Sequence, residues 1–375
     1  MNSVVKIHMK ELQEILKKVS NFAPDEKAIL ATVVDVQGSG YRRAGARMLI
    51  DENGFSIGTV SGGCLEADVL ERTKKVLETG EPQVFVYDTT ALEDSVFSLN
   101  MGCRGVIRIL LETISSQDKY LEFLERFWLE NLAGVVITTL ISPSENIPNK
   151  IGSKLLTIPD FIFHNEFDNV LENKLLKIAE NTICDKKSQI VTVEDAEFFF
   201  EYLPPQVLLT IFGAGTDAIP LCNFAKNLGW RVSIIDHRPA FATKDRFPLA
   251  DNVSVMMPED FGVFTPSDGN YATVAMSHNY SRDKDIIWRF LNTTAFYVGA
   301  LGPKKRTEKI LQELAEEGKK FPPENLANLY APIGLDIGAN SPEAIALAII
   351  AEINAVLANR NGGFLRERQG SIYER

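Results

Sequence analysis

Hydrophobic and polar positions in the first 115 residues change period several times, which predicts an alternation of helices and strands. Leu12, Ile15 and Leu16 share one face at helical spacing. The β-branched runs that follow are typical of strands, and Asn53-Gly54 between two of them predicts a hairpin turn. We expect helices at Met9–Phe22 and Ser61–Leu77, and strands at Ala28–Val36, Arg47–Ile50, Phe55–Val60, Val84–Tyr87 and Val106–Leu111.

A second cycle of similar pattern follows a helix expected at Lys119–Trp128. Ala133–Ile141 resembles Ala28–Val36, and Gly152–Leu156 resembles Gly45–Leu49. The pattern suggests a degenerate internal repeat within one mixed α/β domain, with chance similarity as the alternative. Because the second cycle has no Ser-Gly-Gly-Cys segment, we expect any chemistry in the first.

Two adjacent prolines, Pro204 and Pro205, predict a boundary between domains 1–204 and 205–375, because they cannot continue the interior of a sheet. Beyond them, uninterrupted apolar strands alternate with helices, which favours a doubly wound parallel sheet covered on both faces. We expect strands at Val207–Phe212, Arg231–Asp236, Asn252–Met256, Tyr271–Ser277 and Ala295–Ala300, and helices at Thr216–Leu228, Lys284–Leu291, Lys304–Glu317 and Ala344–Ala358.

Composition narrows the class of protein. The 375 residues are 45% hydrophobic and 24% charged, with a formal net charge of −11. The acidic balance disfavours a nucleic-acid binder, which needs a basic face, and no apolar run is long enough to span a bilayer. Four cysteines without a CxxC pair disfavour a disulfide framework and a structural zinc site. We therefore expect a cytoplasmic protein.

A glycine-rich turn follows the first strand of the second domain and opens a helix, which is the context of a dinucleotide-binding site. Gly213 would form the tight turn, Gly215 would let the backbone approach a pyrophosphate, and Ala218 replaces the third glycine. Asp236 ends the next strand, where a carboxylate binds a ribose diol. Arg238 is placed to meet a 2′-phosphate, so NAD and NADP both stay open. The alternative is a fold that keeps the turn and binds nothing.

The segment Ser61-Gly62-Gly63-Cys64 contains the first candidate cysteine. Ser61 would be the N-cap of a helix, which places Cys64 in its first turn, where a thiolate is favoured. The two glycines would leave backbone N–H groups free to contact an anionic ligand. The alternative is a buried structural cysteine after a tight turn.

Gly102-Cys103-Arg104 contains the second candidate cysteine. Glycine gives little packing and marks close approach of backbone or ligand, and Arg104 would lower the pKa of the thiol. A structural role is the alternative. Cys184 and Cys222 lie among apolar helix residues, so we expect both in the core.

His278 follows the fourth strand of the second domain. Because ligands of open α/β sheets bind beyond the carboxyl ends of the strands, His278 is a candidate acid/base or ligand contact. A surface or capping histidine is the alternative.

These motifs resemble the XdhC/CoxI family, the accessory factors of xanthine dehydrogenase and related molybdenum hydroxylases. The resemblance covers nearly the whole chain except about 118–203. The matching stretches are SGGCLEADVL (61–70), GCRGVIRILLE (102–112), FGAGTDAIPL (212–221), IIDHRPAFATKDRFPLAD (234–251), SHNYSRD (277–283), YVGALGPKKR (297–306) and APIGLDIGANSPEAIALAIIAEI (331–353).

The resemblance implies a cofactor-handling domain followed by a Rossmann-like domain. Such proteins bind the molybdenum cofactor, protect it while its terminal sulfur is installed, and deliver it to the apo-hydroxylase. It also implies a cysteine desulfurase as a partner, and a homodimer. By their places in the motifs, Cys64 and Cys103 are the candidate cofactor contacts and molybdenum ligands, and a soft metal suits a thiolate.

Two positions depart from the family pattern. Arg104 stands where the family has glycine, and it would either clamp a phosphate bidentately or close the site. Thr216 stands where the family often has histidine. Two other functions stay open: an NAD(P)-dependent oxidoreductase with His278 as acid/base, and a dinucleotide or redox sensor.

Overall fold

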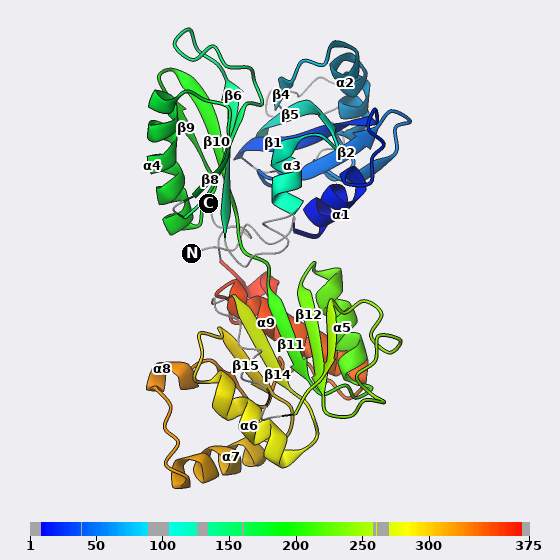
Figure 1. Cartoon of the computed structure of the whole chain (residues 1–375), viewed down its shortest axis with the longest axis vertical. Helices are drawn as coiled ribbons and strands as arrows, with labels where there is room; N and C mark the ends of the chain where they lie inside the picture. Colours follow the sequence, from blue (N-terminus) through cyan, green and yellow to red (C-terminus); the bar gives the residue numbers. More distant parts are fainter. Residues whose placement is uncertain are drawn as a thin grey trace. The chain divides into compact units, whose positions relative to one another are not determined.

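The chain forms two compact units that divide between Pro205 and Gln206. A computed structural model describes residues 9–38, 40–88, 105–125, 134–159, 161–257, 260 and 270–369. The first unit contains two antiparallel sheets and the second a parallel sheet (Figure 1). The expected fold class, a mixed α/β domain followed by a Rossmann-like parallel sheet, is therefore confirmed.

The first sheet of the first unit has the strand order β3-β2-β1-β5-β4, and every neighbouring pair is antiparallel. Its longest strands, β1 and β5, pair along their whole length with one register shift between Val33 and Asp35. The helix α2 lies between β3 and β4 in sequence. The elements are α1 (Met9–Val19), β1 (Lys27–Gly38), β2 (Arg47–Asp51), β3 (Ser56–Gly58), α2 (Glu66–Thr79), β4 (Gln83–Asp88) and β5 (Gly105–Ser115).

The second sheet repeats this topology. Its strand order is β8-β7-β6-β10-β9, so its first, second and third strands pair as in the first sheet, and α4 again separates the third strand from the fourth. The elements are α3 (Lys119–Phe123), β6 (Val135–Ser142), β7 (Lys154–Ile158), β8 (Phe161–Asn165), α4 (Asn169–Asp185), β9 (Gln189–Val193) and β10 (Ala196–Leu203).

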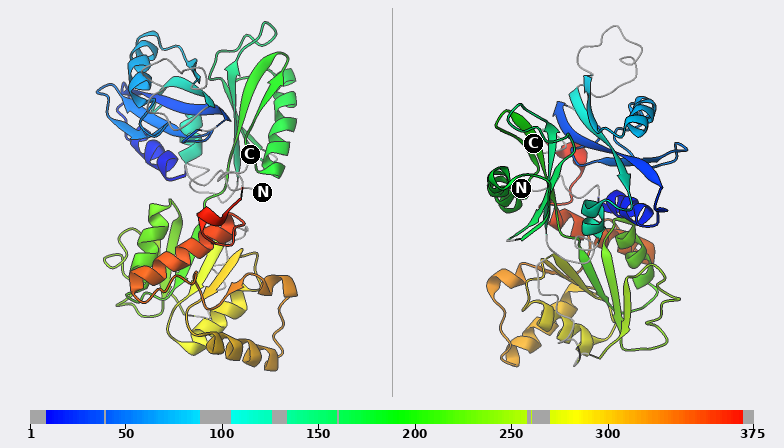
Figure 2. Two further views of the ribbon diagram at one scale, coloured as in Figure 1. Left: turned by 180° about the vertical axis from the view of Figure 1, so that it is seen from behind. Right: turned by 45° about the horizontal axis from the view of Figure 1, so that its top comes forward.

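A small apolar cluster joins the two sheets, which lie side by side (Figures 1 and 2). It consists of Val34 and Leu110 from β1 and β5, and Ile141 and Phe199 from β6 and β10. These are equivalent positions of the two sheets, because Leu110 is opposite Thr32 in the first sheet and Phe199 is opposite Thr139 in the second. The contact between the sheets therefore has approximate two-fold symmetry.

The hydrophobic pattern explains most element positions in this unit. Leu12, Ile15 and Leu16 of α1 are at most 2% exposed and pack in one core cluster, as their spacing predicts. The helix expected from Ser61 begins only at Glu66 and runs to Thr79, and the strand expected to Val60 ends at Gly58. The chain between them is therefore a loop longer than expected.

The second unit is a six-stranded parallel sheet with the order β13-β12-β11-β14-β15-β16, as the alternation of apolar strands and helices predicts. One core cluster includes residues of α5 and α9, and another includes residues of α6 and α7. The order reverses at β11, so its carboxyl end is the switch point of the sheet. The strands are β11 (Leu208–Phe212), β12 (Arg231–Asp236), β13 (Asn252–Val255), β14 (Tyr271–Ala275), β15 (Tyr297–Ala300) and β16 (Leu329–Tyr330).

The helices of the second unit include the apolar stretch expected to be a buried helix. That stretch forms α9, in which Ile349 and Ile353 are fully buried. The helices are α5 (Ala218–Asn227), α6 (Tyr280–Phe290), α7 (Lys304–Glu316), α8 (Pro323–Leu326), α9 (Pro342–Leu357) and the short 3₁₀ helix η4 (Leu365–Glu367).

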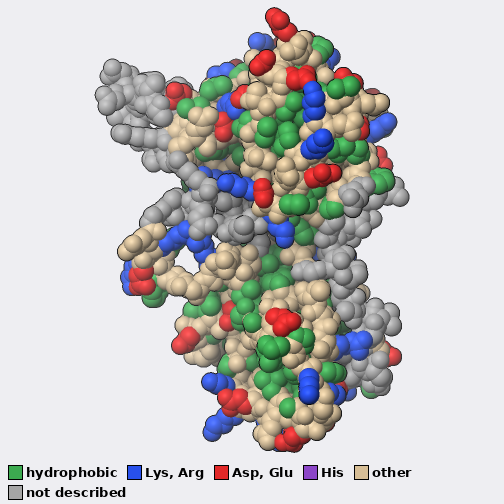
Figure 3. All heavy atoms as spheres, turned by 90° about the vertical axis from the view of Figure 1, so that its left-hand side faces the viewer, with side chains coloured by type: hydrophobic (Ala, Val, Ile, Leu, Met, Phe, Trp, Pro, Cys, Tyr) green, Lys and Arg blue, Asp and Glu red, His purple; other side chains and the backbone are tan. Residues whose placement is uncertain are grey.

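The surface carries charges of both signs. On the face drawn in Figure 3, acidic and basic side chains are interspersed over each unit. Within the described ranges, no helix combines the length and the apolar character that crossing a membrane requires.

Candidate functional site

Cys64 lies on the loop between β3 and α2, and its side chain is exposed. The expectation that Ser61 caps the helix and places Cys64 in its first turn is wrong, because α2 begins at Glu66 with Leu65 at the N-cap position. Ser61 instead contacts the residue just before the helix: its Oγ accepts a hydrogen bond from the backbone N–H of Leu65 at 3.0 Å. The alternative of a buried structural cysteine is also wrong for Cys64, because its side chain is exposed.

The carboxylate of Glu66 organises this loop. Its Oε1 accepts hydrogen bonds from Thr59 Oγ1 and from the backbone N–H of Ser61, at 2.8 Å for the latter. Its Oε2 accepts from Ser61 Oγ and from the backbone N–H of Gly63, at 3.0 Å for the latter. Four donors therefore converge on one carboxylate, which can accept about four bonds.

These bonds change the expected role of the glycines. The N–H groups of Ser61 and Gly63 already donate to Glu66 in this structure, so the anion that the loop holds is an internal one. Burial alone would raise the pKa of Glu66, but the hydrogen bonds from Ser61 and Thr59 outweigh burial and hold the pKa below its ordinary value. Glu66 is therefore an ionised anchor at neutral pH.

Tyr41 stands next to the same loop. Its side chain is 67% exposed, and its ring packs against Gly62: a Cβ added at Gly62 would lie 2.9 Å from Tyr41 Cδ1. Glycine at this position therefore permits a close contact between an aromatic ring and the loop that contains Cys64. Sequence reasoning missed Tyr41 and Glu66, and the available signal for Glu66 was an acidic residue near the start of a predicted helix.

The segment that contains the second candidate cysteine is not among the described residues. Gly102, Cys103 and Arg104 lie outside the described residues, which resume at Gly105 where β5 begins. Their roles stay predictions. Of the two cysteines expected in the core, Cys222 is buried, and burial raises the pKa of its thiol to about 11. Cys184 is exposed, contrary to expectation, because it lies in the last turn of α4.

The glycine-rich turn of the second unit follows β11, as its sequence predicts. Gly213 has a φ of 124°, and a Cβ there would lie 2.3 Å from the backbone oxygen of Met276. A Cβ on Gly215 would lie 2.6 Å from Asp217 Oδ1. A backbone contact and a positive φ thus account for Gly213, whereas Gly215 faces only the end of a movable side chain, and approach of a pyrophosphate to it stays a prediction.

Asp236 ends β12 with its side chain only 1% exposed. Its Oδ2 accepts from the backbone N–H of Ala214 at 2.7 Å and from Arg238 Nη2 at 2.7 Å, and its Oδ1 accepts from Arg238 Nε at 3.0 Å. Burial opposes ionisation, but Arg238 and the Ala214 N–H lower the pKa of Asp236 to about 2. The geometry gives both side chains an internal role, and their contacts with a ribose or a 2′-phosphate stay predictions.

His278 lies just beyond β14, at the carboxyl edge where the sequence predicts it. Its ring Nε2 is 3.0 Å from Asp217 Oδ2, and its backbone φ is +56°. The side chain is 63% exposed. His278 therefore bridges the loops after β11 and β14, which flank the switch point of the sheet.

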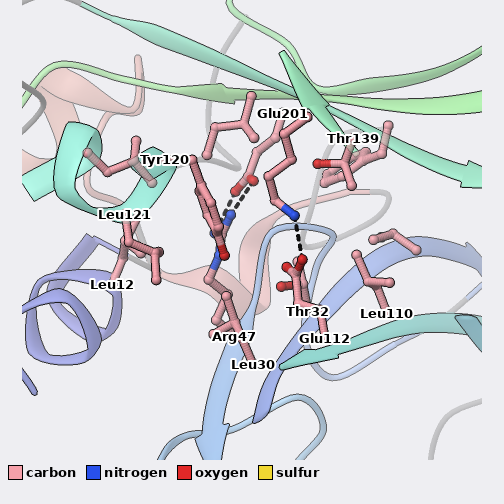
Figure 4. Close-up of a pocket in the computed structure, with 15 residues that line it drawn as sticks. Leu12, Leu30, Thr32, Arg47, Leu110, Glu112, Tyr120, Leu121, Thr139 and Glu201 are labelled. Carbon is pink, nitrogen blue, oxygen red and sulfur yellow. Dashed lines mark hydrogen bonds and ion pairs between the residues drawn. The ribbon is translucent and has the colours of Figure 1, made fainter. Parts of the chain in front are cut away.

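Two buried ion pairs cross between the sheets of the first unit (Figure 4). Arg47 of β2 forms a bidentate pair with Glu201 of β10, with Nη1 2.7 Å from Oε1. Lys154 of β7 pairs with Glu112 of β5. All four side chains are at most 9% exposed. Since β2 and β7 are equivalent strands, as are β5 and β10, the two pairs are reciprocal.

The ion pairs line a cavity of about 10 Å³ that also includes Thr32, Thr139 and Tyr120. That volume is about what one water molecule needs. Burial first, and then the charge of Glu112, raise the pKa of Tyr120 well above its ordinary value. The cavity is therefore a polar interior between the two sheets and is too small for an organic ligand.

Comparisons with known proteins agree with these features. The XdhC and CoxI family matches residues 22–88, which include the Cys64 loop, and the XdhC Rossmann domain matches residues 209–353. A Bacillus subtilis (strain 168) protein, named as a probable xanthine dehydrogenase subunit, is 33% identical over 88% of this chain and 92% of its own length.

Two further relatives cover most of the chain. The Escherichia coli (strain K12) molybdenum cofactor insertion chaperone PaoD is 23% identical over 88% of this chain and 83% of its own. A crystal structure described as a xanthine dehydrogenase from Bacillus halodurans is 30% identical, with a TM-score of 0.75, over 93% of this chain and 96% of that one. From these matches and the fold, the chain belongs to the XdhC and CoxI family.

Proposed function

We propose that this protein binds the molybdenum cofactor as a cargo and inserts it into a xanthine dehydrogenase-type molybdenum hydroxylase. The name of the Escherichia coli relative supports the insertion role, and the names of the two Bacillus relatives support the class of client. We also propose that the protein supports sulfuration of the cofactor together with a cysteine desulfurase. We further propose that it is a homodimer.

The exposed thiol of Cys64 is the single observation that carries the proposal. Molybdenum is a soft metal in this cofactor, and a thiolate is a suitable ligand for it. A cargo that must be handed to another protein has to be held where that protein can reach it, and Cys64 is exposed on a loop anchored by Glu66. The first unit therefore provides the contact with the cargo through Cys64, together with Cys103, the second candidate from the sequence.

The phosphate of the pterin needs a different partner. Because the N–H groups of Ser61 and Gly63 donate to Glu66, they do not supply the cradle that a phosphate requires. We propose Arg104 for this contact, since a guanidinium binds phosphate bidentately. The second unit then serves as a platform for the client or for the second copy of the chain.

The NAD(P)-dependent oxidoreductase is the alternative. The occupied carboxylate of Asp236 disfavours it, because a buried acid that already accepts from Ala214 and Arg238 is not poised to bind a ribose diol. An absorbance change at the nicotinamide band on adding a candidate substrate with NAD(P)H would support this alternative over the chaperone.

Molybdenum retention by cysteine variants tests the proposal. Purified protein is loaded anaerobically with molybdenum cofactor, desalted and analysed for bound molybdenum. We expect Cys64→Ala and Cys103→Ala to retain at least about tenfold less than wild type, since even the loss of a residue that hydrogen-bonds a metal ligand lowers metal affinity about tenfold or more. Cys184→Ala is the matched control, because Cys184 is also exposed. Equal retention by wild type and Cys64→Ala would contradict the role of this thiol.

A further inference from the structure

We propose that Glu66 is the positioning residue of the Cys64 site and fixes the loop in the shape that presents the thiol to the cargo. This inference rests on the proposed function of Cys64. It adds a residue that itself has no contact with the metal, because its carboxylate is filled by donors from the loop.

The hydrogen bonds anchor the loop on both sides of the cysteine. Before it, Thr59, Ser61 and Gly63 donate to the carboxylate directly. After it, the backbone N–H of Leu65 donates to Ser61 Oγ, which in turn donates to Glu66. Cys64 therefore lies exposed between residues that are tied, directly or through Ser61, to the side chain of Glu66.

The two glycines make such an anchor necessary. Gly63 has a φ of 108°, and a Cβ added there would meet nothing within 4 Å, so no packing restrains it. Gly62 lies against the ring of Tyr41, which is itself exposed. Glycine loses more conformational freedom on ordering than other residues, so this loop would sample many shapes without the Glu66 bonds.

A purely structural role is the competing explanation. Glu66 is the first residue of α2, and a carboxylate in the first turn stabilises a helix through its dipole. Such a role would lower the melting temperature when Glu66 is replaced but would leave the behaviour of the thiol unchanged. The test must therefore measure the thiol and the cargo as well as stability.

Cargo binding by three variants of the full chain provides the first measurement. In an anaerobic titration with molybdenum cofactor, we expect Glu66→Gln to bind about tenfold more weakly than wild type, because an amide cannot accept all four hydrogen bonds. Glu71→Gln is the matched control, since Glu71 lies on the same helix in an exposed pair with Lys74 and should bind like wild type.

The third variant, Cys64→Ala, distinguishes a failure of the inference about Glu66 from a failure of the proposed function of Cys64. If Cys64→Ala binds weakly and Glu66→Gln binds like wild type, the positioning role of Glu66 is overturned and the proposed function stands. If Cys64→Ala binds like wild type, the proposed function of this thiol fails, and with it the inference.

The alkylation rate of Cys64 is the second measurement, and it also covers a variant that folds less stably. Iodoacetamide labelling is followed from pH 6 to pH 10 by peptide mass spectrometry, with the exposed Cys184 as a reference in the same molecule. We expect Glu66→Gln to raise the rate at Cys64, relative to Cys184, at least about threefold, since a loop that has lost part of its anchor samples more open shapes in which the thiol is easier to reach. An unchanged Cys64 profile with a lowered melting temperature would establish the structural explanation instead.

Discussion

At the scale of single residues, both candidate sites are organised by a carboxylate that accepts from backbone N–H groups. Glu66 does so for the Cys64 loop, and Asp236 does so for the glycine-rich turn through the N–H of Ala214. In each case the side chain takes the donors that a glycine-rich loop would otherwise offer to an external anion. The shape of both loops therefore depends on ionised carboxylates, which makes it sensitive to acid.

Acid titration of Asp236 follows from this dependence. Its pKa of about 2 in the folded protein is below the ordinary value of 3.8, so its contribution to stability is present above pH 4 and is lost as the pH falls towards 2. Between these limits we expect a loss of about 2 kcal/mol. The difference in free energy of unfolding between wild type and Asp236→Asn, measured by urea denaturation from pH 5 to pH 2, should shrink by that amount. A difference that stays constant over this range contradicts the assignment.

At the scale of elements, two reciprocal buried ion pairs connect the two sheets of the first unit. Burial alone would lower the pKa of Arg47, but the charge and hydrogen bonds of Glu201 outweigh it and raise the pKa. Both cations also donate to a backbone oxygen two residues earlier, Arg47 to Gly45 and Lys154 to Gly152. The pairs thus connect equivalent turns of the two sheets.

Replacing one partner of such a pair should be strongly destabilising. Glu201→Ala leaves the Arg47 guanidinium buried without its counter-charge, which costs about 3–5 kcal/mol. Glu71→Ala removes an exposed partner of Lys74 and should cost less than about 1 kcal/mol. Chemical denaturation measures both. The double variant Arg47→Met with Glu201→Leu should recover most of the loss, and a failure to recover would mean that the pair is needed for more than charge balance.

The sequence predicts the elements better than their long-range partners. The parallel sheet of the second unit follows from apolar strands that alternate with helices, and the buried face of α1 follows from Leu12, Ile15 and Leu16. The residues before α2 form a loop where the sequence predicts a helix, because a serine ahead of a helical pattern is also the signal of an N-cap. The pair between Arg47 and Glu201 could not be predicted from the sequence for two reasons. Charged residues on strands are normally exposed, and these two lie 154 positions apart.

At the scale of the whole molecule, each unit has its own hydrophobic cores. Among the described residues, two core clusters belong to the second unit and four belong to the first. Separate cores allow a unit to open without opening its neighbour. Stability is therefore expected to be a property of each unit.

Hydrogen exchange of the Glu201→Ala variant tests this expectation. Protection should fall in the strands of both sheets of the first unit, because the lost pair joins them, and should be unchanged in β11 and β14 of the second. Mass spectrometry of peptic peptides locates the change. Loss of protection in β11 and β14 would show that the two units unfold together.

The repeated topology of the first unit has a consequence for stoichiometry. Its two halves offer two equivalent connections from a third strand to a helix, yet they differ in length: residues 59–65 join β3 to α2, whereas only residues 166–168 join β8 to α4. Only the longer connection contains the glycines and a cysteine. If the proposed cargo binds at this connection, the single Cys64 loop of each chain predicts one equivalent of cargo per chain, which molybdenum analysis of the loaded protein would measure.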